Sequence, residues 1–295
     1  MILSIIMAVY NEESYIRESI NSILSQQHED FELIIVDDGS TDKTAGYIEN
    51  YLEDQRIKYI NEGKIGKVEA FNIGFKESKG QFICFFHGDD IMTSKSIVSR
   101  LDYIKSIHDK PVAVAGKLKT ISNIKKFDSI LIPKGKHATF SGQSIMFSRI
   151  LGDLIFPIPK SLPNEDYWMR LHIDVFSEKI FHTREIVALY RIHENNSFLS
   201  SDTINNFNKK SEKIHVRRIQ VASAFLGQYK KELSKDFIKK IEIEIKAENY
   251  RYNGRIIKLF FSSLSLKRKL SFIIESNRFF YKIKNIYPNF FIGWG

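Results

Sequence analysis

The chain has 295 residues, of which 43% are hydrophobic and 27% are charged, and its formal net charge is +9. This length suffices for one large domain or two smaller ones, and the composition excludes a fully disordered chain. The single cysteine, Cys84, excludes an intramolecular disulfide, and no apolar stretch reaches the roughly 18 residues that span a bilayer.

An apolar strand is predicted at the start of the chain. Residues 2–9 are rich in β-branched side chains, and no basic segment precedes them, so they indicate a core strand and not a secretory leader. Ser14 or Asn11 is expected to cap the helix that follows. The apolar face of that helix has helical spacing and is made by Ile16, Ile20, Ile23 and Leu24.

The next elements continue this alternation. Residues 31–36 form a second strand that is nearly continuous in apolar residues, as buried parallel strands are. Gly39 allows a tight turn, and Ser40 or Thr41 is expected to cap the next helix. A third strand is predicted over 57–60, a helix over 66–78 and a fourth strand over 81–86. The alternation predicts an α/β fold with a parallel sheet and helices on both faces.

Polar residues follow three of these strands, namely Tyr10, Asp37-Asp38 and Asp89-Asp90. In parallel sheets ligands bind beyond the carboxyl ends of the strands, so these residues are expected to meet at one edge. Carboxylate oxygens suit Mg²⁺ or Mn²⁺, and these ions share their coordination shell with substrate phosphates. Asp89-Asp90 therefore indicates a divalent-cation site, with a solvated turn as the alternative.

The second half of the chain is less regular. Strands are predicted over 112–116, 144–147 and 186–190, and a helix around Trp168 follows a proline-rich loop. Beyond Asp202 the chain is predicted to be helical. Residues 204–295 carry 20 Lys or Arg and 7 Asp or Glu, which leaves a charge of −4 for residues 1–203. This asymmetry indicates two functional parts, a body and a basic C-terminal region.

Five segments within roughly residues 1–200 carry a family pattern. They are Ile5–Asn11, Val36–Thr44, Gly66-Lys67 with Asn72–Gly74, His87–Asp90, and Glu165–Tyr167 with Tyr190–His193. In this order they resemble the inverting, nucleotide-sugar-dependent glycosyltransferases of family 2, which have the GT-A fold. The resemblance implies a GT-A catalytic domain over 1–203, with a Rossmann-like, mostly parallel sheet flanked by helices. A helical basic region over 204–295 would follow it.

The resemblance also implies which residues meet the donor. Ala8, Tyr10 and Asp38 would contact the nucleotide, and Asp38 would accept the N3–H of a uracil. The alternative is a turn in which Asp37 and Asp38 bond to local backbone N–H groups. Lys67, with the N–H groups at the start of its helix, would face the diphosphate, although exposed lysines are abundant in this chain.

The segment His87–Asp90 matches the family's metal-binding motif, but His87 replaces the usual first acid. Asp89 and Asp90 would hold Mn²⁺ or Mg²⁺, and Asp89 would also contact the nucleotide at a ribose hydroxyl. The role of His87 stays open between ribose contact, metal ligation and space filling. His193 would complete the metal shell, with an ordinary surface histidine as the alternative.

Asp166 matches the family's catalytic base, which takes the proton of an acceptor hydroxyl. The alternative is an acid that is only stabilised by the start of its helix. The implied reaction transfers a sugar, with inversion, from a UDP-linked donor to a hydroxyl of a saccharide or lipid-linked acceptor. The implied setting is bacterial surface polysaccharide synthesis.

Two other functions compete with this one. A catalytically silent, sugar-nucleotide-binding partner subunit of an active transferase stays open because of His87. A sugar-phosphate nucleotidyltransferase would need a glycine-rich basic loop near the N-terminus, where Tyr10–Glu13 offers acids instead.

The C-terminal region interleaves basic and aromatic residues. Lys267–Lys269 has Phe260-Phe261, Phe279–Tyr281 and Phe290-Phe291 around it in sequence. This pattern suits an anionic membrane surface that carries a lipid-linked acceptor, and it predicts a cytoplasmic protein, peripheral on the inner face of the cell membrane. A helical subdomain with a solvated basic face is the alternative. No nucleic acid is expected as a partner, because no recognised module is present.

Overall fold

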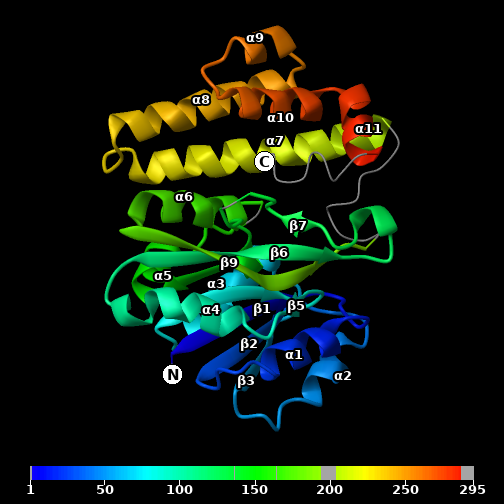
Figure 1. Cartoon of the computed structure of the whole chain (residues 1–295), viewed down its shortest axis with the longest axis vertical. Coiled ribbons are helices and arrows are strands. Elements are labelled where there is room, and N and C mark those ends of the chain that lie inside the picture. The colour runs from blue at the N-terminus through cyan, green and yellow to red at the C-terminus, as the bar shows by residue number, and fades with distance from the viewer. Residues whose placement is uncertain (1, 136, 164, 194–203, 287–295) are drawn as a thin grey trace. The chain divides into compact units, whose positions relative to one another are not determined.

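The computed structural model describes residues 2–135, 137–163, 165–193 and 204–286 (Figure 1). The chain forms two compact units. The first comprises Met1–Ile121 and Ser129–Arg191, and the second comprises Ser122–Asp128 and Ile192–Gly295. The boundary expected at residue 203 falls at the edge of a stretch, 194–203, that lies outside the described residues.

The first unit contains one mixed sheet. Its strands are β1 Leu3–Val9, β2 Phe31–Asp37, β3 Ile57–Asn61, β4 Phe82–His87, β5 Ile91–Met92, β6 Val112–Ile121, β7 Leu131–Ile132, β8 Ile145–Ser148 and β9 Lys179–Arg191. Their order is β3-β2-β1-β4-β8-β6-β9-β5, and β7 pairs with β6. The pairs β3–β2, β2–β1 and β1–β4 are parallel, as the sequence predicted, whereas β8 runs antiparallel to β4 and β6.

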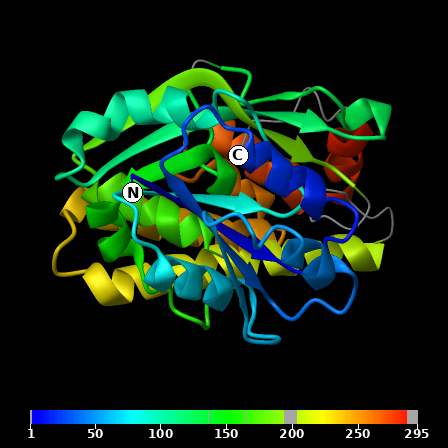
Figure 2. The ribbon, with the colours of Figure 1, turned by 90° about the horizontal axis from the view of Figure 1, so that it is seen from below.

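The helices of the first unit cover both faces of this sheet. They are α1 Ile16–Leu24, α2 Thr44–Glu49, α3 Lys67–Glu77, α4 Ser96–Ile104, α5 Arg149–Ile155 and α6 Asp166–Phe176. Figure 2 shows α1 and α4 on one side of β1, where Ile5 shares a core with Ile20 and Leu101. On the opposite side α3 packs so closely that a Cβ on Gly74 would collide with Ile6. The alternating side chains of β1 therefore fix two helical layers.

The second unit is helical. Its helices are α7 Ile204–Tyr229, α8 Lys235–Tyr252, α9 Ile256–Phe260, α10 Leu266–Ser276 and α11 Arg278–Ile286 (Figure 1). The hydroxyls of Ser234 and Ser265 cap α8 and α10. A small core joins Ala247, Leu259 and Phe272. No helix in the described part of the chain is long and apolar enough to cross a membrane.

The predicted helix caps of the first unit are wrong. The cap residues of α1 and α2 are Tyr15 and Lys43, and neither helix has a side-chain cap bond. The polar side chains instead bond across two loops. The Oδ1 atom of Asn11 accepts from the Thr41 N–H at 2.8 Å, and the Asn11 N–H donates to Ser40 Oγ at 2.9 Å. Their role is to hold the ends of β1 and β2 together.

Candidate active site

The carboxyl ends of β1, β2 and β4 meet at one edge of the sheet. In the register of these parallel strands Val9 pairs with Asp37, and Ala8 pairs with His87. The Asp38 N–H donates to the Val9 carbonyl at 2.9 Å. Tyr10, the Asp37-Asp38 pair and the segment His87–Asp90 therefore leave the sheet side by side, as expected from the alternation of elements.

Both acids at the end of β2 are bonded within the protein. Asp37 accepts from the Ser40 N–H at 2.8 Å and from the Tyr59 hydroxyl at 2.9 Å. Asp38, which is buried, accepts at Oδ1 from the backbone N–H groups of Ile65 and Gly66 and at Oδ2 from Lys64 Nζ at 2.7 Å. The two acids fix the turn after β2 and the loop before α3.

Gly39 makes this approach of the two loops feasible. Its φ is +72°, and an added Cβ would lie 2.7 Å from Lys64 N and 2.8 Å from the Gly63 carbonyl carbon. Only a residue without a side chain leaves room for both backbones.

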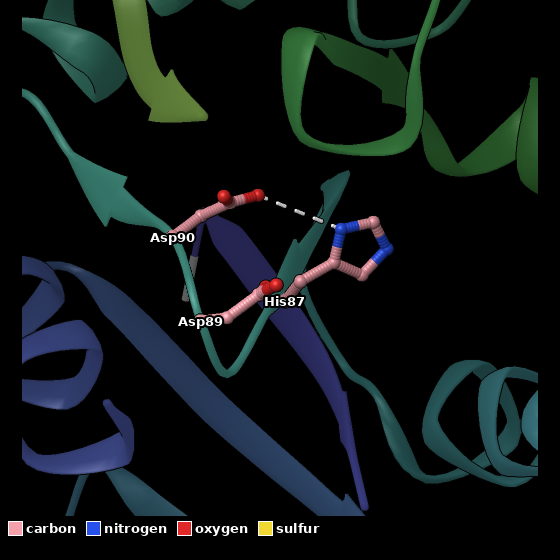
Figure 3. A group of neighbouring side chains, drawn as sticks. All are labelled: His87, Asp89 and Asp90. Carbon is pink, nitrogen blue, oxygen red and sulfur yellow. Dashed lines mark ion pairs between the residues drawn. The ribbon is translucent and has the colours of Figure 1, made fainter. Parts of the chain in front are cut away.

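A group of metal-ligating side chains follows β4 (Figure 3). One nitrogen of His87 and one carboxylate oxygen each of Asp89 and Asp90 all lie within 4.8 Å of one another. His87 Nδ1 is 3.6 Å from Asp90 Oδ2, the pair that the dashed line marks. Two carboxylates and an imidazole form a donor set that suits Mn²⁺. The group therefore fits a divalent cation.

Asp90 is the least accessible member of this group. It is fully buried, its Oδ1 accepts from the Arg191 N–H at 2.8 Å, and its Oδ2 accepts from Gln143 Nε2 at 3.0 Å. Burial, followed by the charge of Asp89, raises the pKa of Asp90 to about 6. Arg191 also donates from Nε to the Asp89 carbonyl at 2.7 Å, so the end of β9 supports this turn.

Glu12 lies against the same turn and had no role assigned from the sequence. An added Cβ on Gly88 would lie 3.1 Å from Glu12 Cγ. Burial, with the nearby charges of Asp89 and Asp90, raises the pKa of Glu12 to about 8. In the sequence, only the position of Glu12 directly after Tyr10-Asn11 indicated that it lies near the site.

A second acidic group forms at the start of α6. Asp166 Oδ1 accepts from the Gly142 N–H at 3.1 Å, and burial, followed by the charge of Glu165, raises the pKa of Asp166. Lys67 Nζ lies 2.6 Å from Glu165 Oε1, and the Glu165 side chain is 1% exposed. Burial alone would lower the pKa of Lys67, but the charges of Glu165 and Asp166 raise it.

Gly142 connects the two groups. An added Cβ there would lie 3.6 Å from Asp166 Oδ1 and 3.8 Å from His87 Cε1. Asp166 and the His87–Asp90 segment, 76 or more positions apart in sequence, are thus neighbours in space. Both acidic groups were predicted from the sequence, whereas Gly142 and Gln143 were not, because neither belongs to a motif.

The other site residues predicted from the sequence are Tyr10, Ala8 and His193. Tyr10 is 44% exposed, and Lys64 Nζ lies 3.1 Å from its ring centroid. Ala8 is within β1 and beside His87 in register. His193, which the sequence predicted as a metal ligand, belongs to the second unit. The histidine that lies with Asp89 and Asp90, among the described residues, is His87.

Comparison with known proteins identifies relatives. Residues 4–141 match the family described as glycosyl transferase family 2. A protein of Haemophilus influenzae, described as an uncharacterized glycosyltransferase, is 29% identical over 233 residues, covering 73% of this chain and 90% of that protein. The glycosyltransferase GlyA of Streptococcus pneumoniae is 24% identical over 65% of this chain, and the match spans only 31% of its own length.

Solved structures support the fold. TarS 1–349 of S. aureus in complex with UDP-GlcNAc has a TM-score of 0.65 at 20% identity, with 96% of this chain and 81% of that chain covered. The mannosyltransferase PcManGT of Pyrobaculum calidifontis, in complex with GDP-Man and Mn²⁺, has a TM-score of 0.63 at 13% identity, with 97% and 87% covered. The fold is thus of the GT-A type that the sequence predicted.

Proposed function

Since residues 4–141 belong to glycosyl transferase family 2, we propose that this chain transfers a sugar from a nucleotide-diphosphate sugar, UDP-linked, to a hydroxyl group. The acceptor is a saccharide or a lipid-linked saccharide, the anomeric configuration is inverted, and the pathway is bacterial surface polysaccharide synthesis. The observation that carries the proposal is the proximity of Asp166 to the His87–Asp90 segment around Gly142. A base and a cation site must flank the same anomeric carbon in such a reaction.

Asp166 is the proposed catalytic base. Burial raises its pKa, so its carboxylate is a stronger base than an exposed aspartate. The Gly142 N–H holds one carboxylate oxygen, and the other remains to take the proton of an acceptor hydroxyl. The start of α6 fixes the position of this side chain, because Trp168 Nε1 donates to the Ile155 carbonyl at 2.9 Å.

Asp89 and Asp90 are the proposed ligands of Mn²⁺ or Mg²⁺. Two histidines are candidates for the third ligand. His87 is favoured by its proximity to Asp89 and Asp90, and His193 is favoured by the family resemblance. A bound divalent cation would neutralise charge on the departing nucleoside diphosphate. Lys67, whose ammonium is held by Glu165, is proposed to face the same diphosphate.

Binding and turnover test this function. In a panel of nucleotide sugars with Mn²⁺, a UDP-sugar should raise the melting temperature, because a ligand of the folded state stabilises it. The same sample should release UDP in the presence of Mn²⁺. Binding of a UDP-sugar without any release of UDP would favour the alternative, a catalytically silent partner subunit. This alternative is supported by His87, which replaces the acid expected at that position.

The second unit is proposed to dock on an anionic membrane surface, with the protein peripheral on the inner, cytoplasmic face. Ile257, Phe261 and Phe279 are 75%, 80% and 67% exposed, and Lys267–Lys269 is close to them in sequence. Apolar side chains beside lysines suit insertion between anionic headgroups. Phe290 and Phe291, which extend this pattern in sequence, lie outside the described residues.

Vesicle sedimentation of the full chain tests this docking. Phe261→Ser and Phe279→Ser together should reduce sedimentation with phosphatidylglycerol vesicles and leave phosphatidylcholine vesicles unaffected. Leu52→Ser, at an apolar side chain of the first unit that is 43% exposed, is the matched control. Equal sedimentation of the double variant and the control would reject the membrane role.

A further inference from the structure

The ammonium of Lys64 lies between an aromatic ring and a carboxylate at the carboxyl edge of the sheet. Its Nζ is 3.1 Å from the ring centroid of Tyr10 and 2.7 Å from Asp38 Oδ2. Tyr10 and Asp38 come from adjacent strand ends, and Lys64 comes from the loop between β3 and α3. Three separate segments thus contribute one group each to a single small site.

Asp38 has only one oxygen available to a ligand. Its Oδ1 is bonded by the backbone N–H groups of Ile65 and Gly66, which hold the carboxylate in place. Its Oδ2 is bonded by Lys64 Nζ. A ligand group that displaces the Lys64 ammonium can therefore hydrogen-bond to Asp38 Oδ2, whose position is fixed.

The Lys64 side chain can move while its backbone stays fixed. The N–H of the next residue, Ile65, donates to Asp38, and the backbone nitrogen of Lys64 itself lies against Gly39. The side chain, in contrast, is 57% exposed, and its long stem has several rotatable bonds. The ammonium can leave Asp38 and still remain within reach of it.

We propose that Lys64 reads the base of the donor nucleotide; this rests on the proposed function. A base that stacks on Tyr10 and donates an N–H to Asp38 Oδ2 takes the space of the ammonium. The ammonium then moves along the edge of the base and donates to the carbonyl next to that N–H. Asp38 and Lys64 together present an acceptor beside a donor.

This pair matches uracil better than the other bases. Uracil offers the N3–H with a carbonyl on each side. Cytosine in the same position offers Asp38 a lone pair at N3, and on its C4 side it offers Lys64 an amino group instead of a carbonyl, so like groups would meet at both contacts on that side. Guanine offers an N–H and a carbonyl, but its amino group needs a second acceptor, and Asp38 Oδ1 is already bonded. A site that hydrogen-bonds a substrate rejects analogues that leave its polar groups unpaired.

The affinity ratio of UDP to CDP isolates this contact. Displacing the ammonium from Asp38 opposes every base equally, so this cost cancels in the ratio. Isothermal titration of the full chain with Mn²⁺ gives both dissociation constants. We expect the wild-type protein to prefer UDP and Lys64→Met to lower the preference about tenfold, as the loss of one charge-assisted hydrogen bond implies.

Two further variants serve as controls. Lys64→Arg keeps a donor and should keep most of the preference. Lys58→Met, at a lysine that pairs with Glu77 on the surface, should leave the ratio unchanged. An unchanged ratio in Lys64→Met, even with both affinities raised, would overturn the inference and leave the proposed function standing. Failure of the wild-type protein to bind UDP would overturn the proposed function itself.

Discussion

Lys67 and Glu165 form an asymmetric ion pair. Their charged atoms are 2.6 Å apart, yet the Glu165 side chain is 1% exposed and the Lys67 side chain 50% exposed. The partner that depends on the pair is therefore the carboxylate, which has no comparable access to water. Because Asp166 follows Glu165 directly, this pair also determines the charge beside the proposed base.

Lys67→Met should destabilise the protein more than Glu165→Gln does. The first variant leaves a buried carboxylate without its cation, at a cost of about 1–3 kcal/mol, whereas the second leaves a lysine that water can solvate. Urea unfolding measures both free energies. Lys160→Met breaks a similar but exposed pair with Glu69 and should cost less than about 1 kcal/mol. Equal losses for Lys67→Met and Lys160→Met would contradict the asymmetry.

Asp166→Asn should reduce turnover by a factor on the order of 10²–10⁴, because the amide cannot take the acceptor proton. Donor affinity should change little, since the Gly142 N–H can still donate to the amide oxygen. Initial rates and donor titration separate the two effects. Asp174→Asn, on the same helix and paired with Arg170, is the control and should retain activity. Normal turnover in Asp166→Asn would remove Asp166 from the mechanism.

Titration with Mn²⁺ in the presence of UDP tests which histidine is the third ligand of the proposed metal site. Asp89→Asn should abolish Mn²⁺-dependent binding, and His87→Ala should weaken Mn²⁺ affinity at least about tenfold, because the structure groups His87 with Asp89 and Asp90. The exposed His108 provides the control variant His108→Ala. Loss of affinity in His193→Ala, with none in His87→Ala, would instead favour the ligand that family resemblance implies.

Gly39→Ala and Gly63→Ala form a matched pair. Both glycines have φ above +70°, but an added Cβ on Gly63 meets no atom within 4 Å, whereas on Gly39 it meets the backbone of the Lys64 loop. Gly63→Ala should cost about 1 kcal/mol from the backbone conformation alone. Gly39→Ala should cost at least about twice that. Thermal unfolding compares them, and equal melting temperatures would show that the loops are not in close contact.

The stability of the first unit should fall in mild acid through His172. This side chain is fully buried, its Nδ1 bonds to the Trp168 carbonyl, and burial lowers its pKa to about 4. Between pH 6.5 and 4 the unfolded chain binds a proton at His172 that the folded chain does not, so stability decreases as pH falls. The decrease from this residue should be roughly 2 kcal/mol between pH 6.5 and 5.

The variant His172→Gln removes the titrating group, so its unfolding free energy should change less with pH than that of the wild-type protein. His108→Gln, at an exposed position, should follow the wild-type profile. Parallel profiles for wild type and His172→Gln would mean that the pKa of His172 is the same in the folded and the unfolded protein, which would contradict the prediction.

The sequence predicted the first four strands because buried parallel strands are continuous in apolar residues, as in Phe31–Asp37. The antiparallel insertion of β8 could not be predicted, because a strand of four residues carries no signal for its partners. The same holds for caps: Ser40 has the right residue type, but its hydroxyl bonds to the other loop. The type of each local element could be predicted from the sequence, but the partners with which strands and side chains pair could not.

The candidate site follows the same division. Acids after strands, such as Asp38 and Asp89, were predictable because position after a strand determines the edge at which they lie. Gln143 and Lys64 act through contacts with residues 53 and 26 positions away, and neither belongs to a motif. Such partners depend on tertiary packing alone.

The second unit is discontinuous along the chain, since Ser122–Asp128 joins Ile192–Gly295 in it. Ser122 Oγ donates to the Ile192 carbonyl at 2.8 Å within that unit. In a hybrid protein whose C-terminal helices come from a relative, those helices would therefore pack with the segment Ser122–Asp128 of the original chain. Swapping this unit between transferases requires grafting both pieces together.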